Sequence, residues 1–328
     1  MILPPFVCPR CHGTLTRTND AYTCEPCNAR YPIVEGIPDF RVFPDPWIGL
    51  EDDRAKGARV AAMTQNADFE GTVRAYWSIT PDTPKELAER YVQHVVRAKE
   101  RSREWLDTLP PARTGPWLEL GCGTGDLLAS AAPRGTAIVG TDIAFRWLVV
   151  ARRRPELRDR AIPLVACCAE ALPFARGAFA RVVALGLLEH CADPGPVCRE
   201  VRRVLASGGD VALRTVNRYS LLAEPHVQVW GVGFVPRAYA DRYVHWRSGL
   251  RYQHHRPISA GETRSALRSA GFRDVRVGAA RVLNEERATL GAAGRALTPV
   301  YAAARRTPLV SNALALCAPL LEASAVAP

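Results

Sequence analysis

Two groups of residues in this 328-residue chain have types and spacings that favour chemistry. The first is the segment 117–126, WLELGCGTGD, where Gly121, Gly123 and Gly125 occupy every second position after Glu119. Glycine reaches positive φ at little cost and has no Cβ to block a ligand. The segment therefore predicts a buried strand, a tight turn and a helix start that cradle a small cofactor, with a purely structural turn as the alternative.

The second group is a set of cysteines near the N-terminus. Cys8 and Cys11 form one C-x2-C pair, Cys24 and Cys27 form another, and twelve residues separate the pairs. Two thiolate pairs at this spacing can close a tetrahedron around Zn²⁺, and such a filled site is structural. Two disulfides are the rival interpretation, which a cytosolic chain disfavours. His12 is adjacent but surplus, and the other six cysteines are expected to be small core residues.

The cofactor follows from the spacing of the glycines. A dinucleotide-binding fingerprint needs its third glycine at position 126, which is Asp126 here. The pattern E-x-G-x-G-x-G resembles instead the first motif of class I S-adenosylmethionine (SAM) dependent methyltransferases. Asp142 comes 21 residues after Gly121, at the end of the apolar run 137–141. A carboxylate at the end of the second strand is placed to accept both hydroxyls of a ribose.

Three further segments resemble the type 11 methyltransferase group, and the resemblance spans residues 117–282. They are AEALPF at 169–174, LEH at 188–190 and RVLASGG at 203–209. The resemblance implies that SAM is held by Glu119, Gly121, Gly123, Gly125, Asp142, Ile143, Ala169, Glu170 and Leu185.

Two acids that this group usually carries are replaced here. Cys168 stands where an acid is thought to meet the adenine amino group, and Ala180 stands in the group's F-D-x-V segment. Because a thiol is a poor acceptor, we expect backbone groups or Glu170 to hold the adenine. Weaker SAM binding than is usual in the group is therefore expected.

Strand and helix patterns alternate after the glycine turn, and the resemblance is to the methyltransferase fold. We therefore expect an α/β protein with a doubly wound, Rossmann-like, seven-stranded and mostly parallel sheet that binds its ligand at the carboxyl ends of the strands. The predicted strands cover 137–141, 163–167, 181–186, 210–216, 274–282 and a final antiparallel strand at 321–326. The predicted helices cover 84–109, 144–153, 196–205, 259–270, 285–305 and 309–318.

The cysteine segment has a resemblance of its own. Residues 6–41, with the tail YPIVEGIPDF, resemble the zinc-ribbon domain that acts as a small activator subunit of tRNA and release-factor methyltransferases. This resemblance implies docking against the methyltransferase domain and no catalytic role. The expected domains are a zinc ribbon at 1–43, a linker and helical cap at 44–110, and a SAM-dependent methyltransferase domain at 111–328 with a substrate insertion at 217–257.

The insertion is rich in aromatic residues and in histidine. An aromatic-lined substrate pocket is one interpretation, and a satellite core of aromatic residues is the other. Transfer of a methyl group to oxygen or nitrogen requires proton removal, so we hypothesise that His190 or His226 is the catalytic base. Some relatives hold a metal with Glu and His here, but Leu187 stands where another acid would help, so we expect no catalytic metal.

Composition and charge set the remaining expectations. The net charge of +10 comes almost entirely from arginine, without any run of five or six basic residues, so we expect arginines on solvated faces. We see no signal peptide, and the apolar tract Leu309–Leu321 is too short to span a bilayer, so a cytoplasmic location is expected. We expect a methyltransferase acting on a small-molecule or lipid-like acceptor. An RNA or protein methyltransferase and a catalytically degenerate SAM-fold partner are the alternatives.

Overall fold

The computed structural model describes residues 4–80, 83 and 85–328 of the chain. These residues form two compact units. The first runs as far as Val183 and includes 203–206, and the second holds 184–202 and 207–328.

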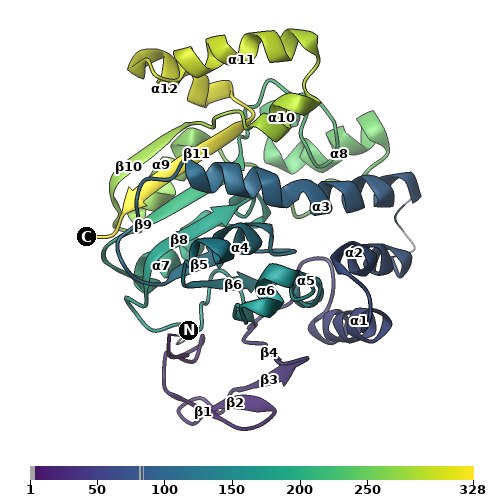
Figure 1. The fold of residues 1–328 in the computed structure, drawn as a ribbon. Coiled ribbons are helices and arrows are strands. Elements are labelled where there is room, and N and C mark those ends of the chain that lie inside the picture. The colour runs from purple at the N-terminus through teal and green to yellow at the C-terminus, as the bar shows by residue number, and fades with distance from the viewer. Residues whose placement is uncertain (1–3, 81–82, 84) are drawn as a thin grey trace. The chain divides into compact units, whose positions relative to one another are not determined.

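The first unit begins with a small antiparallel sheet in the strand order β1-β2-β3-β4. Its strands are β1 (Leu15–Arg17), β2 (Ala21–Cys24), β3 (Arg30–Val34) and β4 (Ile37–Pro38), the four purple strands of Figure 1. His12 and Asn28 have φ of 59° and 53°, so each turns the chain sharply just after a cysteine pair. We call residues 4–41 the ribbon.

Three helices follow the ribbon. They are α1 (Leu50–Met63), α2 (Phe69–Ser78) and α3 (Lys85–Asp107). The predicted helix at 84–109 corresponds to α3, although Pro84 itself lies outside the described residues. The first two helices were not predicted. Gly57 of α1 explains part of this, since a Cβ there would lie 2.7 Å from the ring of Phe145, and close packing at a glycine leaves no apolar pattern in the sequence.

The parallel strands of the first unit run in the order β8-β5-β6-β7. Their bounds are β5 (Trp117–Leu120), β6 (Ile138–Asp142), β7 (Leu164–Ala166) and β8 (Phe179–Leu185). Short helices connect them, namely α4 (Asp126–Ala131), η1 (Ala132–Arg134), α5 (Phe145–Ala151) and α6 (Pro155–Asp159). Gly140 lets α4 pack tightly on β6, because a Cβ there would lie 2.4 Å from Leu128 Cδ1.

The second unit contains an antiparallel set of strands in the order β10-β11-β9. These are β9 (Leu205–Val216), β10 (Arg273–Ala279) and β11 (Leu320–Val326). The other elements are η2 (Leu188–His190), α7 (Pro194–Val204), η3 (Val232–Phe234), α8 (Arg237–Ser248), α9 (Ala260–Ser269), α10 (Asn284–Thr289), α11 (Ala292–Ala304) and α12 (Pro308–Cys317).

The full strand order is β10-β11-β9-β8-β5-β6-β7, which confirms the expected seven-stranded α/β sheet with one antiparallel strand inserted late in the chain. The single helix predicted at 285–305 is wrong, because the structure has two helices there, α10 and α11. They are separate because Leu290 and Gly291 both take extended backbone angles.

The expectation of solvated arginines is also wrong for the densest cluster. Arg152 donates to the backbone oxygen of Glu35, Arg153 to that of Ala61 and Arg154 to that of Thr124. Three consecutive arginines at the end of α5 therefore form hydrogen bonds to the backbone of three other segments. Within the described ranges 4–80, 83 and 85–328, no helix has both the length and the apolar character needed to cross a bilayer.

Candidate functional site

The glycine turn lies between β5 and α4 and has the backbone that its sequence predicts. Gly121, Gly123 and Gly125 have φ of 68°, 48° and 75°. A Cβ on Gly125 would lie 2.9 Å from Leu157 Cδ2, so this glycine allows close packing. A Cβ on Gly123 would meet nothing within 4 Å. The middle of the turn is thus open on the side that a side chain would otherwise occupy.

Asp142 holds this turn in place from the end of β6. Its carboxylate accepts the backbone N–H of Gly123 at Oδ2 and that of Ala144 at Oδ1, each over 2.7 Å. Burial raises the pKa of Asp142, although both amide bonds oppose that effect. The residue expected to bind a ribose therefore also fixes the loop that faces the cofactor.

Glu119 at the end of β5 is a buried carboxylate with an unsatisfied oxygen. Only 2% of the residue is exposed, and Oε2 has no hydrogen-bond partner. Burial, with the charges of Asp126 and Asp142, raises the pKa of Glu119 well above its usual value. Buried polar atoms are nearly always hydrogen-bonded, so an orphaned oxygen beside an open glycine turn fits a missing polar ligand.

The remaining expected cofactor residues of the first unit lie on two loops. Ala169 and Glu170 follow Cys168, whose buried thiol donates to the backbone oxygen of Phe43 over 3.6 Å. Burial raises the pKa of Glu170. The side chain in the position of the usual acid is therefore turned to the segment that follows the ribbon, and the described contacts give it no acceptor role.

Ile143 is held by a buried network of charges that the sequence did not reveal. Arg41 donates to its backbone oxygen over 2.9 Å and to Asp39 and Asp53 over 2.6 Å and 2.5 Å. Asp53 in turn accepts the backbone N–H of Phe145 over 2.9 Å. The side chains of Arg41, Asp39 and Asp53 are fully buried, so the network firmly connects the ribbon's last residues to the loop after β6.

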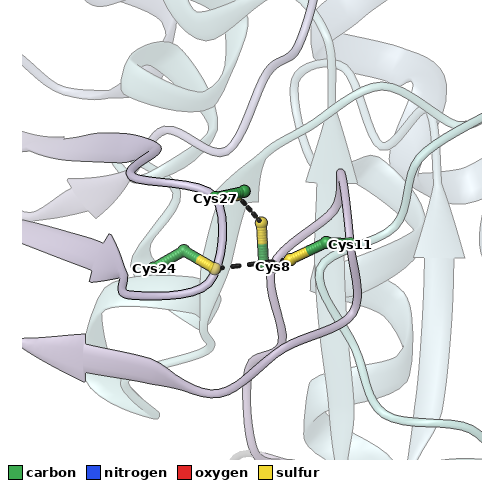
Figure 2. A group of neighbouring side chains, drawn as sticks. All are labelled: Cys8, Cys11, Cys24 and Cys27. Atoms are coloured by element: carbon green, nitrogen blue, oxygen red, sulfur yellow. Dashed lines mark hydrogen bonds between the residues drawn. The ribbon is translucent and has the colours of Figure 1, made fainter.

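The four cysteines of the ribbon gather in one cluster. Figure 2 shows that Cys8 and Cys11 approach Cys24 and Cys27 from a second loop, and all four ligand atoms lie within 4.8 Å of one another. The Sγ atoms of Cys8 and Cys27 are 3.5 Å apart, and those of Cys11 and Cys24 are 3.4 Å apart. Zinc–sulfur bonds of about 2.3 Å in a tetrahedron put sulfurs about 3.8 Å apart, so the donor set fits Zn²⁺.

The ribbon packs on the parallel strands of its own unit. Asp39 bridges to Ala166 of β7, and Phe40 donates its N–H to the Ala166 oxygen over 2.7 Å. The ring of Phe6 packs against Phe40 and Phe174 at centroid distances of 4.9 Å and 5.7 Å. The ribbon thereby covers the edge strand of the sheet, where unpaired backbone groups would otherwise be exposed.

In the second unit, His190 and His226 lie together with a third histidine, His255. The ring centroids are 5.0 Å apart for His190 and His226, 5.2 Å for His190 and His255, and 4.2 Å for His226 and His255. His255 was not singled out from the sequence as a site residue. Leu185, also in this unit, is half-buried at the end of β8.

Different neighbours shift the pKa values of two of these histidines in opposite directions. Burial alone would lower the pKa of His226, but its hydrogen bond to Glu224 and the charge of that residue raise it. Burial, with the nearby histidines His226, His190 and His254, lowers the pKa of His255 to about 3. His255 is therefore neutral at physiological pH.

The insertion around these histidines has an aliphatic core. Val227, Val229, Val232, Val244 and Tyr252 are buried together. Its large aromatic residues are instead mostly exposed, with exposed fractions of 59% for Trp230, 51% for Phe234, 56% for Tyr239 and 74% for Trp246. Neither an enclosed aromatic pocket nor a satellite core of aromatic residues therefore describes the insertion, because its buried core is mainly valine.

Known proteins resemble the segment of this chain that contains the glycine turn and Asp142. A family model described as a methyltransferase domain matches residues 118–213. A ubiquinone biosynthesis O-methyltransferase of Idiomarina loihiensis is 30% identical over 49% of this chain and 62% of its own length. A demethylmenaquinone methyltransferase of Thermus thermophilus is 36% identical over 40% of this chain and 58% of its own length. The chain thus spans less than two thirds of the curated relatives that it matches.

Solved structures give a more distant likeness. A SAM-dependent methyltransferase from Mesorhizobium loti aligns with 70% of this chain and 99% of its own, at 20% identity and a TM-score of 0.47. That likeness is too remote to support an argument about the site. Residues 118–213 thus match a methyltransferase domain, and the glycine turn and the strand order agree with that match.

Proposed function

We propose that this chain is a SAM-dependent methyltransferase that acts on a small-molecule or lipid-like acceptor. The observation that carries the proposal is the pairing of an open glycine turn with the orphaned, buried oxygen of Glu119. The relatives include a ubiquinone biosynthesis O-methyltransferase and a demethylmenaquinone methyltransferase, which favours a small acceptor over RNA or protein.

Within the first unit, each residue has a distinct task in holding SAM. Backbone amides of the turn approach the cofactor where Gly123 leaves space, and Asp142 offers its carboxylate to the ribose. Glu119 provides a buried acceptor for the cationic amino acid end. When bound, SAM supplies an electrophilic methyl group, and the protein aligns the acceptor with it.

For an oxygen or nitrogen acceptor, the enzyme also has to assist proton removal. The candidates are His190 and His226, in keeping with their sequence positions after β8 and in the insertion. Alanine variants of each test this role. An unchanged kcat in both variants would remove the two histidines from the mechanism.

We further propose that the cysteine cluster holds a structural Zn²⁺. Four sulfurs that complete a tetrahedron would leave no position for water, so the metal would stabilise the ribbon and take no part in catalysis. Atomic spectroscopy of the purified protein should give one zinc per chain for this cluster.

The function is tested by incubating the protein with methyl-labelled SAM and a set of acceptors. The set should include hydroxylated quinols, cell RNA and a protein extract. Label in the small molecules supports the proposal, whereas label confined to RNA or protein would assign the other acceptor class. SAM binding without transfer to any fraction would favour a degenerate partner protein.

A further inference from the structure

We propose that His190, His226 and His255 form a second metal site, which binds a divalent transition metal ion such as Zn²⁺ through three imidazoles. All three lie in the second unit, and their ligand nitrogens lie within 4.8 Å of one another. The site does not depend on SAM, so it can be tested separately from the proposed function.

The three side chains provide donor atoms that transition metal ions prefer. Three neutral imidazoles with an open fourth position are the ligand set of several catalytic zinc sites, and imidazole also suits Cu²⁺, Ni²⁺ and Fe²⁺. Metal–nitrogen bonds of about 2.1 Å in a tetrahedron place nitrogens about 3.4 Å apart. The observed separations, all within 4.8 Å, are of the same order as that value.

Hydrogen bonds from Glu224 hold His226 in an orientation that suits a metal ligand. His226 contacts Oε1 of Glu224 through Nδ1 over 2.6 Å, which directs Nε2 to be the ligand atom. Glu224 is buried, and its Oε2 accepts the backbone N–H groups of His226 and Val227 over 2.8 Å and 3.1 Å. A carboxylate that fixes the far nitrogen of a histidine is the usual support of a metal-binding imidazole.

The three histidines are also held by well-anchored segments. His226 directly precedes Val227, which belongs to the buried valine core. The same core includes Tyr252, whose ring centroid lies 5.6 Å from that of His255. Arg256 donates its backbone N–H to the oxygen of Glu189 over 2.5 Å and its guanidinium to the oxygen of Ala192. These bonds join the residue after His255 to both sides of His190.

The position of the histidines at the surface is compatible with exchange of ligands. His190 is exposed and the other two are half-buried, so an ion held there can still bind water or a small oxygen ligand. A metal ion lowers the pKa of a water molecule or hydroxyl group that it binds. The expectation of no catalytic metal considered Leu187 alone, and this proposal differs because the insertion supplies two more histidines.

The test is the metal content of protein purified without a histidine tag. After dialysis against Zn²⁺ and then against metal-free buffer, the wild type should retain two zinc ions per chain, one for each cluster. His190→Ala, His226→Ala and His255→Ala should each retain one, while His245→Ala, an exposed histidine at the end of α8, should retain two. One zinc in the wild type, or two in all of the variants, would overturn the proposal.

A second variant distinguishes loss of the metal site from loss of the folded structure. Glu224→Gln keeps every metal ligand and should weaken zinc binding at the histidine cluster by about 10-fold to 100-fold in a competition assay with a chelator dye. Co²⁺ replacement identifies the site that is lost, because only the cysteine cluster gives sulfur-to-metal charge-transfer absorption. Unchanged affinity in Glu224→Gln, with unchanged far-ultraviolet circular dichroism, would contradict the assigned geometry.

Discussion

Asp142 Oδ2 accepts the backbone N–H of Gly123 over 2.7 Å, so the carboxylate at the end of β6 determines the shape of the turn after β5. This relationship connects the two sequence features that predicted the cofactor. It implies that Asp142 acts twice, once on the empty loop and again on the bound ribose.

Asp142→Ala should therefore weaken SAM binding strongly. The change removes two hydrogen bonds to a charged group, each worth about 1.5–3 kcal/mol, and we expect Kd to rise by at least tenfold. Calorimetric titration measures this, with the exposed Asp159→Ala as the control. Equal affinity in the two variants would show that the carboxylate has no part in binding.

Gly123→Ala should separate backbone strain from loss of binding. Both Gly123 and Gly135 have positive φ, and a Cβ on either meets nothing within 4 Å. Alanine at either position should cost about 1–2 kcal/mol of unfolding free energy. Only Gly123→Ala should also weaken SAM binding, because its Cβ would occupy the cofactor's side of the turn. A similar loss of affinity in Gly135→Ala would mean that strain alone is responsible.

SAM affinity should depend on pH through Glu119. Burial and two neighbouring acids raise its pKa well above the usual value, and a cationic ligand favours the ionised carboxylate. Affinity should accordingly rise as pH rises through this pKa, and binding should be accompanied by proton release. Glu119→Gln should abolish that part of the pH dependence, while titration of the cofactor's own amino group persists. The same pH profile in wild type and variant would exclude Glu119 as the cause.

Arg41→Met should destabilise the first unit by about 3 kcal/mol, at the lower end for a broken buried pair, since it leaves Asp39 with only Arg54 and Asp53 with only Arg146 as cationic partners. Urea unfolding measures the change, and Arg158→Met, on an exposed ion pair, is the matched control. Because Arg41 also holds the Ile143 oxygen, SAM binding should weaken as well. A loss below 1 kcal/mol would mean that the network is not a link between ribbon and cofactor loop.

Cys24→Ser should release the ribbon's zinc and lower the melting temperature. The ribbon is too short to fold on burial alone, and its packing on β7 depends on the aromatic residues beside the cysteines. Cys317→Ser, which changes a half-buried cysteine far from the cluster in sequence, should retain zinc and stability. Equal zinc content in the two variants would rule out the cysteine cluster as a metal site.

The sequence predicted the catalytic sheet well because strand, glycine turn and helix start each have a local signal. Trp117–Leu120, the glycines and the apolar residues of α4 are contiguous, so the pattern is visible without tertiary information. The same is true of the cysteine pairs, whose spacing predicts that the four thiols lie close together.

The residues that escaped prediction depend on contacts between distant segments. His255 becomes a candidate site residue only because folding brings its ring next to that of His190, 65 positions earlier. No local sequence pattern predicts this contact. Arg41 and Asp53 similarly appear as ordinary surface charges until folding buries them against Ile143. The arginines 152–154 were expected on a solvated face, yet each donates to a backbone oxygen of another segment.

The most direct test of the account is a calorimetric titration of the zinc-loaded protein with SAM, followed by S-adenosylhomocysteine. We predict saturable binding of one molecule per chain, and a clear loss of affinity in Asp142→Ala. Absence of binding at millimolar SAM, by protein that is folded and zinc-loaded, would contradict the assignment of a working cofactor site to the glycine turn.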